Sequence, residues 1–256
     1  MTLFGWAGLA GTTFAAALLQ AVSGFGFAVL AVPLYLLFVD PAKAVQLVIV
    51  LSTALSFAVV PGLRRTIAPA LLLRLIAGSL AGLPIGLFSF RYADRLLVRL
   101  GVGVTILAFA VMMAAFRRRG GRPWTPFGRT QPRDLAAGAV AGVATALVGM
   151  AGPPVLIYLL LTGTAAQTVR ATLLAFFALS YGATLASHAA TIGIPGPTWA
   201  AAAILAPFAL FGGLVGRPIG DRLGSDGFAI LAIALLTAAG LYTAAAAGVE
   251  LATRQP

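Results

Sequence analysis

Long apolar stretches alternate with short polar connections along the whole chain. Eight such stretches can be delimited, over 3–38, 43–62, 69–89, 96–116, 135–162, 167–190, 197–216 and 227–248. Most contain about 20 residues, the length that an α-helix needs to cross a hydrocarbon core of ~30 Å. The pattern therefore predicts an all-α integral membrane protein.

The first and fifth stretches are too long for a single crossing. At 1.5 Å per residue, 3–38 would form a rod of roughly 54 Å. Each of the two contains a natural breaking point, which is Ser23-Gly24-Phe25-Gly26 in the first and Gly149-Met150-Ala151-Gly152-Pro153-Pro154 in the fifth. We expect each stretch to form a helix, a break and a second, shorter helix.

The two halves of the chain repeat one another. Matching residues recur in the same order at offsets of roughly 125 to 130, as in an internal repeat: Gly24 and Gly149, Gln46 and Arg170, and Gly82/Gly86 and Gly212/Gly216. We therefore expect a membrane repeat over 1–116, a basic linker over 117–134 and a second membrane repeat over 135–256.

Composition supports a membrane protein and narrows the functions. Hydrophobic residues make up 61% of the 256 positions and charged residues 9%, whereas a soluble protein carries about a quarter charged residues. The net charge of +11 comes mostly from arginines at the ends of apolar stretches, which fits orientation in a lipid bilayer better than binding to nucleic acid. Cysteine is absent, which excludes disulfides and thiolate catalysis. No metal or cofactor is predicted.

Charge bias favours one topology. If the linker is cytoplasmic and each broken segment returns to the side it left, basic residues divide 12 to 5 in favour of the cytoplasm, against 10 to 7 if each broken segment crosses once. The five outside are Lys43, Arg91, Arg95, Arg99 and Arg254. Three full crossings and a broken hairpin per half would make the halves inverted repeats, the common plan of secondary transporters.

The motifs at the two breaks carry a resemblance to a known family. The run from Gln20 through Gly24 and Gly26 to Pro33, its partner Val148 to Pro154, and the duplicated layout across nearly the whole chain resemble the sulfite exporter TauE/SafE family of anion permeases. The resemblance implies transport of sulfite, sulfonates or related sulfur-containing anions by a multi-pass protein of the prokaryotic plasma or inner membrane. A homo-oligomer is left open.

The breaks are the predicted anion site. The start of a half-helix presents unpaired backbone N–H groups and about half a positive charge, which can hold an oxyanion. Arg170 could add a bidentate guanidinium and Gln46 a neutral donor. The expected substrate-binding residues, at the bilayer midplane between the two breaks, are Ser23, Gly24, Phe25, Gly26, Gln46, Gly149, Met150, Ala151, Gly152, Pro153 and Arg170.

Several alternatives remain at this stage. The glycines could serve only close helix packing, and Arg170 could be an interfacial side chain that reaches toward water. Arg74 is interpreted as interfacial, and His188, the only histidine, as a polar residue near a helix end that could carry a coupling proton. An anion channel is the main functional alternative. An intramembrane serine hydrolase built on Ser23 and His188 is the weaker one, and no catalytic residue is assigned.

Overall fold

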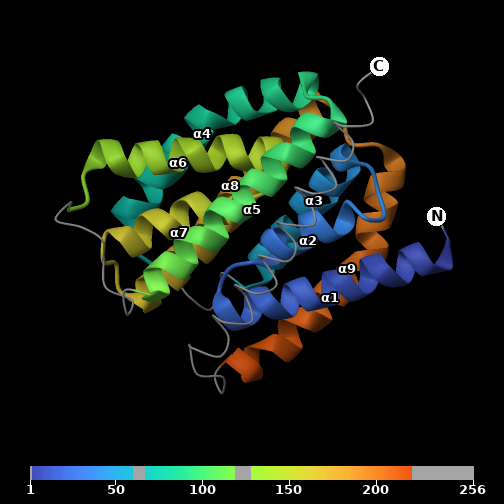
Figure 1. Cartoon of the computed structure of the whole chain (residues 1–256), viewed down its shortest axis with the longest axis horizontal. Coiled ribbons are helices and arrows are strands. Elements are labelled where there is room, and N and C mark those ends of the chain that lie inside the picture. Colours follow the sequence, from blue (N-terminus) through green and yellow to red (C-terminus); the bar gives the residue numbers. More distant parts are fainter. Residues whose placement is uncertain (1, 60–66, 119–127, 221–256) are drawn as a thin grey trace.

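The computed structural model describes residues 2–59, 67–118 and 128–220, and these residues form helices and no strands (Figure 1). The helices are α1 (Leu3–Ser23), α2 (Phe27–Tyr35), α3 (Pro41–Val59), α4 (Pro69–Tyr92), α5 (Arg95–Arg118), α6 (Gln131–Val148), α7 (Gly152–Leu161), α8 (Ala166–Thr191) and α9 (Gly196–Gly220). Seven of the eight predicted stretches are confirmed. The eighth, 227–248, and most of the linker lie outside the described residues.

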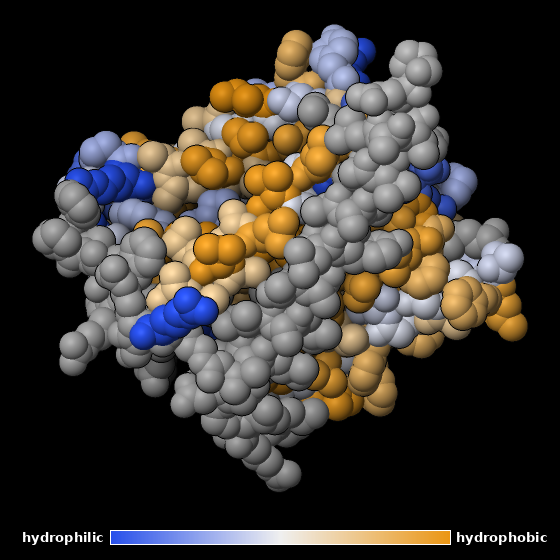
Figure 2. Space-filling model, viewed as in Figure 1, coloured by the Kyte–Doolittle hydropathy of each residue, from blue (hydrophilic) through white to orange (hydrophobic). Residues whose placement is uncertain are grey.

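The helices have the length and surface of a membrane protein. Five of those described are long and apolar enough to cross a bilayer. Apolar side chains form a broad band over the face in Figure 2, with hydrophilic side chains mainly toward its ends. Large side chains that are more than half exposed include Leu73, Ile85, Phe88, Val104 and Leu214. Because a soluble protein rarely exposes so much contiguous apolar surface, this surface fits contact with lipid.

Both long stretches are broken where the sequence predicts. Helix α1 ends at Gly24 with φ at +80°, and α6 ends at Gly149 with φ at +75°. A second left-handed glycine, Gly26 with φ at +111°, precedes α2. A residue with a Cβ pays roughly 1–2 kcal/mol in this conformation, so glycine ends α1 and α6 at little conformational cost.

Each broken segment folds back as a hairpin. In the first, the ring of Phe38 lies against Phe4, 6.4 Å between centroids, and against Gly8 near the start of α1. In the second, the hydroxyl of Tyr158 in α7 donates to the carboxylate of Asp134 near the start of α6. In both hairpins the end of the second helix therefore lies near the beginning of the first.

Glycines join the two halves of the chain. Helices α4 and α6 lie side by side (Figure 1), with Gly78 on the backbone of Leu135 and Gly86 on that of Val143, so the two helices run parallel. A Cβ at either glycine would collide with the neighbouring backbone, which is why small residues are needed. The same parallel packing joins α1 and α9, through Gly212 on Phe14 and Gly216 on Leu18. The recurrent glycine pairs thus lie at matching helix interfaces.

Helices α3 and α8 pack against each other in the interior. The amide of Gln46, near the start of α3, donates to the carbonyl of Gly193, just beyond the end of α8, at 3.0 Å. The two helices occupy the same place in their halves and run in opposite directions. About two-thirds of the apolar span of each helix is buried. Helix α8 therefore runs through the interior, where it can contact both breaks.

Candidate functional site

Arg170, in the first turns of α8, contacts the first break. Its Nη2 donates to the carbonyl of Ala21 at 3.0 Å, while its Nε is buried and has no hydrogen-bond partner. The side chain also fills the space beside Gly24, where a Cβ would lie 2.5 Å from Cγ of Arg170. The guanidinium therefore turns into the protein rather than out toward water, which argues against a purely interfacial role.

A second unpaired donor lies beside the guanidinium. Gln20, in the last turn of α1, is buried, and its Nε2 has no hydrogen-bond partner. Gln20 and Arg170 line one small cavity of about 30 Å³, which is enough for one or two waters. The remaining lining is apolar and small: Ala17, Ala21, Leu55, Leu174 and Gly213. Gln20 was absent from the predicted site, although it is an uncharged polar residue within an otherwise apolar stretch.

The electrostatics of the first break favour an anion. The last carbonyls of α1 carry partial negative charge, and Arg170 compensates one of them. At the start of α2, Gly26 has no side chain to accept from the first N–H groups. Ser23 is occupied, since its hydroxyl donates to the carbonyl of Leu19 or of Phe25 and accepts from the N–H of Phe25. The side-chain donors that remain for a ligand in the cavity are the Arg170 guanidinium and the Gln20 amide.

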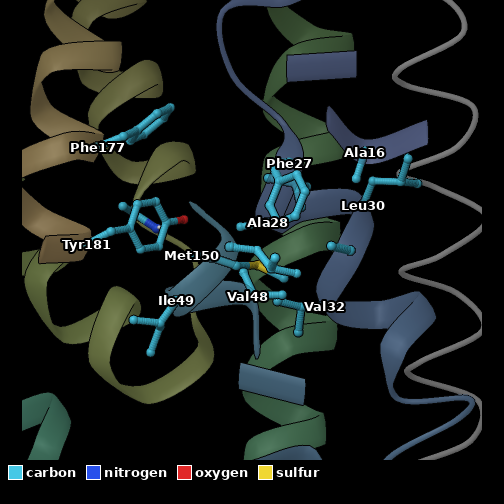
Figure 3. Packing of buried hydrophobic residues seen from close by; sticks show 14 of the residues in the cluster. Ala16, Phe27, Ala28, Leu30, Val32, Val48, Ile49, Met150, Phe177 and Tyr181 are labelled. Atoms are coloured by element: carbon cyan, nitrogen blue, oxygen red, sulfur yellow. The ribbon is translucent and has the colours of Figure 1, made fainter. Parts of the chain in front are cut away.

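The second break is closed by apolar packing. Met150 and Ala151 are fully buried, and Figure 3 shows Met150 beside Val32 and Val48. The hydroxyl of Tyr181 accepts from the N–H of Ala151 at 3.3 Å and donates to the carbonyl of Gly149 at 3.0 Å. One tyrosine thus satisfies both sides of this break.

The second break also offers fewer donors than the first. Pro153 and Pro154 have no N–H, and Tyr181 uses that of Ala151. The backbone of Gly152 is the nearest donor left, and its Cα lies against the ring of Phe177. The prolines that suit the first turn of α7 therefore remove the backbone amides that would bind an oxyanion there.

The predicted site residues do not converge on one point. Gln46 bonds to Gly193, beyond the far end of α8, roughly 35 Å from Arg170 at 1.5 Å per residue. The second break contacts Tyr181, eleven residues after Arg170, or roughly 16 Å along the helix. Instead of sharing a midplane site, the two breaks meet α8 at separate levels.

The structure also separates the pair that a hydrolase would need. Ser23 lies at the first break, whereas His188 lies near the other end of α8 and contacts the carbonyl of Ala146 at 3.1 Å. Along the helix, His188 is roughly 27 Å from Arg170, the neighbour of the first break. A serine activated by this histidine is incompatible with that separation.

One carboxylate is buried, which the sequence did not indicate. The side chain of Asp134 is fully buried and pairs with Arg74 at 3.2 Å, in addition to accepting from Tyr158. Arg74 was predicted to be interfacial. Its side chain is 35% exposed, so only part of it reaches the surface. This cluster ties α4, α6 and α7 together at the end where α6 begins.

Comparison with known proteins agrees with this architecture. The family model described as sulfite exporter TauE/SafE matches residues 9–243, which covers both breaks and both halves. No curated protein and no solved structure matches the chain. The multi-pass helical fold and the family match together confirm the resemblance at the sequence motifs. The chain belongs to the sulfite exporter TauE/SafE family, and it is accordingly a membrane transporter of sulfite or related anions.

Proposed function

We propose that the protein is a secondary carrier that binds a small sulfur-containing oxyanion, sulfite or a sulfonate, beside the first break. One observation carries this proposal: Nε of Arg170 and Nε2 of Gln20 are both buried, both without a partner, and both in side chains that line one cavity. Leaving a buried donor unpaired costs about 1–3 kcal/mol. A ligand that supplies acceptors would recover that energy at both groups.

The chemistry of the cavity selects an anion with several acceptor oxygens. A guanidinium offers planar donors that match a sulfite or sulfonate group, and the Gln20 amide adds a neutral one. The rest of the wall is apolar, which lowers the local dielectric and strengthens the attraction between the guanidinium and an anion.

The size of the cavity fits an alternating carrier. At about 30 Å³ it holds waters and no larger group, so α1, α3, α8 and α9 must separate to admit the anion. We interpret this structure as a closed conformation, in which access to Arg170 is shut. A carrier passes through such a state in every cycle.

The hairpins and the helix directions support the topology that we propose. Helices α3 and α8 run antiparallel, α4 lies parallel to α6, and α1 lies parallel to α9. With the basic linker in the cytoplasm, these directions correspond to two inverted repeats with both termini outside. In this arrangement the first break lies toward the cytoplasmic end of α8, and we place the anion there rather than between the two breaks.

A ligand screen tests the binding site. Purified protein should be heated in the presence of sulfite, sulfate, thiosulfate, sulfoacetate or taurine, because specific binding to the native state raises the melting temperature. We expect at least one anion to stabilise the protein, and Arg170→Gln to abolish that shift. An equal shift in Arg170→Gln and the parent would contradict the proposed site.

Transport kinetics distinguish the carrier from the alternative channel. A carrier must saturate and show counterflow, in which unlabelled anion on one side drives labelled anion to accumulate on the other. A channel shows neither. A flux that rises linearly with anion concentration and shows no counterflow would mean that the protein is a channel and not a carrier.

A further inference from the structure

The two broken helices are capped at the same position by side chains of one helix. Ala21 and Ala146 each lie three residues before the glycine that ends their helix. The carbonyl of Ala21 accepts from Arg170, and that of Ala146 accepts from His188. These are the two basic side chains of α8, and each retains one buried ring or guanidinium nitrogen without a partner.

The contact at Ala146 fixes the state of the His188 ring. A carbonyl can only accept, so Nε2 carries a hydrogen, and in the neutral ring Nδ1 is then an unprotonated acceptor. Nδ1 is buried and has no partner. Thr184, one helical turn earlier on the same face, is fully buried, and its Oγ1 also has no partner. A proton on Nδ1 would create a donor one turn from this unused acceptor.

We infer that His188 is a proton-binding site of the carrier and couples proton movement to the anion held at Arg170. This inference rests on the proposed function, which supplies the transported anion. It assigns proton binding to the second break. Protonated His188 places a positive charge at the negative end of α6, as Arg170 does at the end of α1. The first break then binds the anion and the second responds to the proton.

His188 is fully buried, so its charged form depends on its immediate neighbours, and no charged side chain among the described residues contacts it. On α4, the ring of Phe90 lies 4.8 Å from the imidazole, within the range of a cation–π interaction. The charged residues that follow it, Arg91 and Asp94, are exposed. On α6 the contact is the carbonyl of Ala146. On α3, the ionisable residue nearest the end of α8 is Lys43, one turn before Gln46.

The coupling path is helix α8 itself. Arg170 and His188 lie roughly 27 Å apart along it, which is too far for strong direct attraction between a proton and an anion. A rigid shift of α8 relative to α1 and α6 would change both capping contacts together. In the proposed cycle this shift opens the buried Nδ1 to water on one side, where one proton binds. The proton travels with one anion and leaves to water on the other side, so each cycle moves one negative charge fewer than the anion carries.

Nitrogen NMR of the native chain tests protonation without a substitution. The sequence contains one histidine, so ¹⁵N-histidine labelling of the full-length protein gives a single pair of ring signals. We expect a neutral ring with hydrogen on Nε2 at pH about 8, and a doubly protonated ring by pH about 5, the lower end of the titration. A ring that stays neutral throughout this range in the folded protein would overturn the inference.

Proton and anion fluxes in proteoliposomes test the coupling. Sulfite, thiosulfate and sulfoacetate are loaded in separate runs, the membrane potential is clamped, and an internal pH dye reports protons that leave with the anion. For wild type we expect a fixed ratio of protons to anions. His188→Gln, which keeps a donor for Ala146, should lower that ratio at least tenfold.

Two control variants separate the possible failures. Arg170→Lys should reduce both fluxes and preserve their ratio, and Tyr181→Phe, which disturbs the same break as His188, should also preserve it. If His188→Gln keeps the proton-to-anion ratio of the wild-type protein, the proton site is overturned and the carrier stands. The same holds if the wild-type protein moves the anion without any proton flux. No flux of any of the three anions through wild type would remove both proposals.

Discussion

The carbonyl groups of Ala21 and Ala146 occupy the same place in the two halves of the chain, each in the last turn of a helix that stops at a left-handed glycine. Both carbonyls accept a hydrogen bond from α8. At the first, the donor is permanently charged and lies beside a cavity; at the second, the donor is a histidine in a closely packed interior. The repeated fold therefore presents two chemically different breaks.

Replacing Arg170 should separate charge from geometry. Arg170→Lys keeps the charge but loses the planar fork, and we expect about tenfold weaker anion binding. Arg170→Gln loses the charge as well, and since a charged hydrogen bond contributes about 1.5–3 kcal/mol, the loss should be tenfold to a hundredfold. Calorimetric titration of correctly inserted protein measures both. Identical affinities in all three proteins would show that Arg170 is purely structural.

Gln20 should matter for binding although it carries no charge. Gln20→Leu keeps much of the volume and removes the unpaired donor, so we expect the empty protein to be no less stable. Anion affinity should fall by about threefold to tenfold, the loss of one neutral hydrogen bond. Gln20→Glu is the matched variant, because it places an acceptor and a negative charge opposite the anion and should bind still more weakly. Stronger binding by the glutamate variant would contradict an anion site.

The two break glycines should differ in their effect on binding. Gly24→Ala and Gly149→Ala each force a side chain into the left-handed region, at about 1–2 kcal/mol of stability. At Gly149 the added Cβ would find ordinary spacing, with the nearest atom at 3.5 Å. At Gly24 it would also displace Arg170. Thermal unfolding should show a loss of stability in both variants and a larger loss in Gly24→Ala, in which anion binding should also fall clearly further.

Local features were predictable from the sequence, and tertiary ones were not. Chain length against membrane thickness located both breaks, because that argument needs only the rise of a helix. Gln46 and Arg170 lie at opposite ends of the α3–α8 pair because the two helices run antiparallel, and the sequence carries no signal for that direction. The burial of Asp134 and the role of Gln20 depend on packing between segments far apart in the chain, and single-segment patterns carry no signal for it.

The ion pair between Arg74 and Asp134 should stabilise the folded protein. Asp134→Asn removes the charge that Arg74 and Tyr158 bind inside the protein, and we expect a loss of about 1–3 kcal/mol. Arg74→Gln should cost less, because Arg74 is 35% exposed and water can replace part of its interaction. Thermal denaturation in one detergent compares the two. A larger loss for the arginine variant would contradict this assignment.

Labelling of single cysteines can fix the topology, since the native chain has none. Leu3→Cys lies at the start of α1 and Gly128→Cys just before α6. We expect a membrane-impermeant maleimide added to intact cells to label position 3 and leave position 128 unlabelled until the membrane is opened. Labelling of both, or of position 128 alone, would refute the inverted arrangement.

Isotopic counterflow tests whether the protein is an anion carrier whose binding site is Arg170. Proteoliposomes that contain wild-type protein and unlabelled sulfite are diluted into ³⁵S-sulfite, and the transient accumulation of label is followed over time. The carrier predicts saturable accumulation in wild type and a decrease of at least tenfold in Arg170→Gln at equal protein content. Equal accumulation in the two proteins would contradict an anion carrier whose site is Arg170.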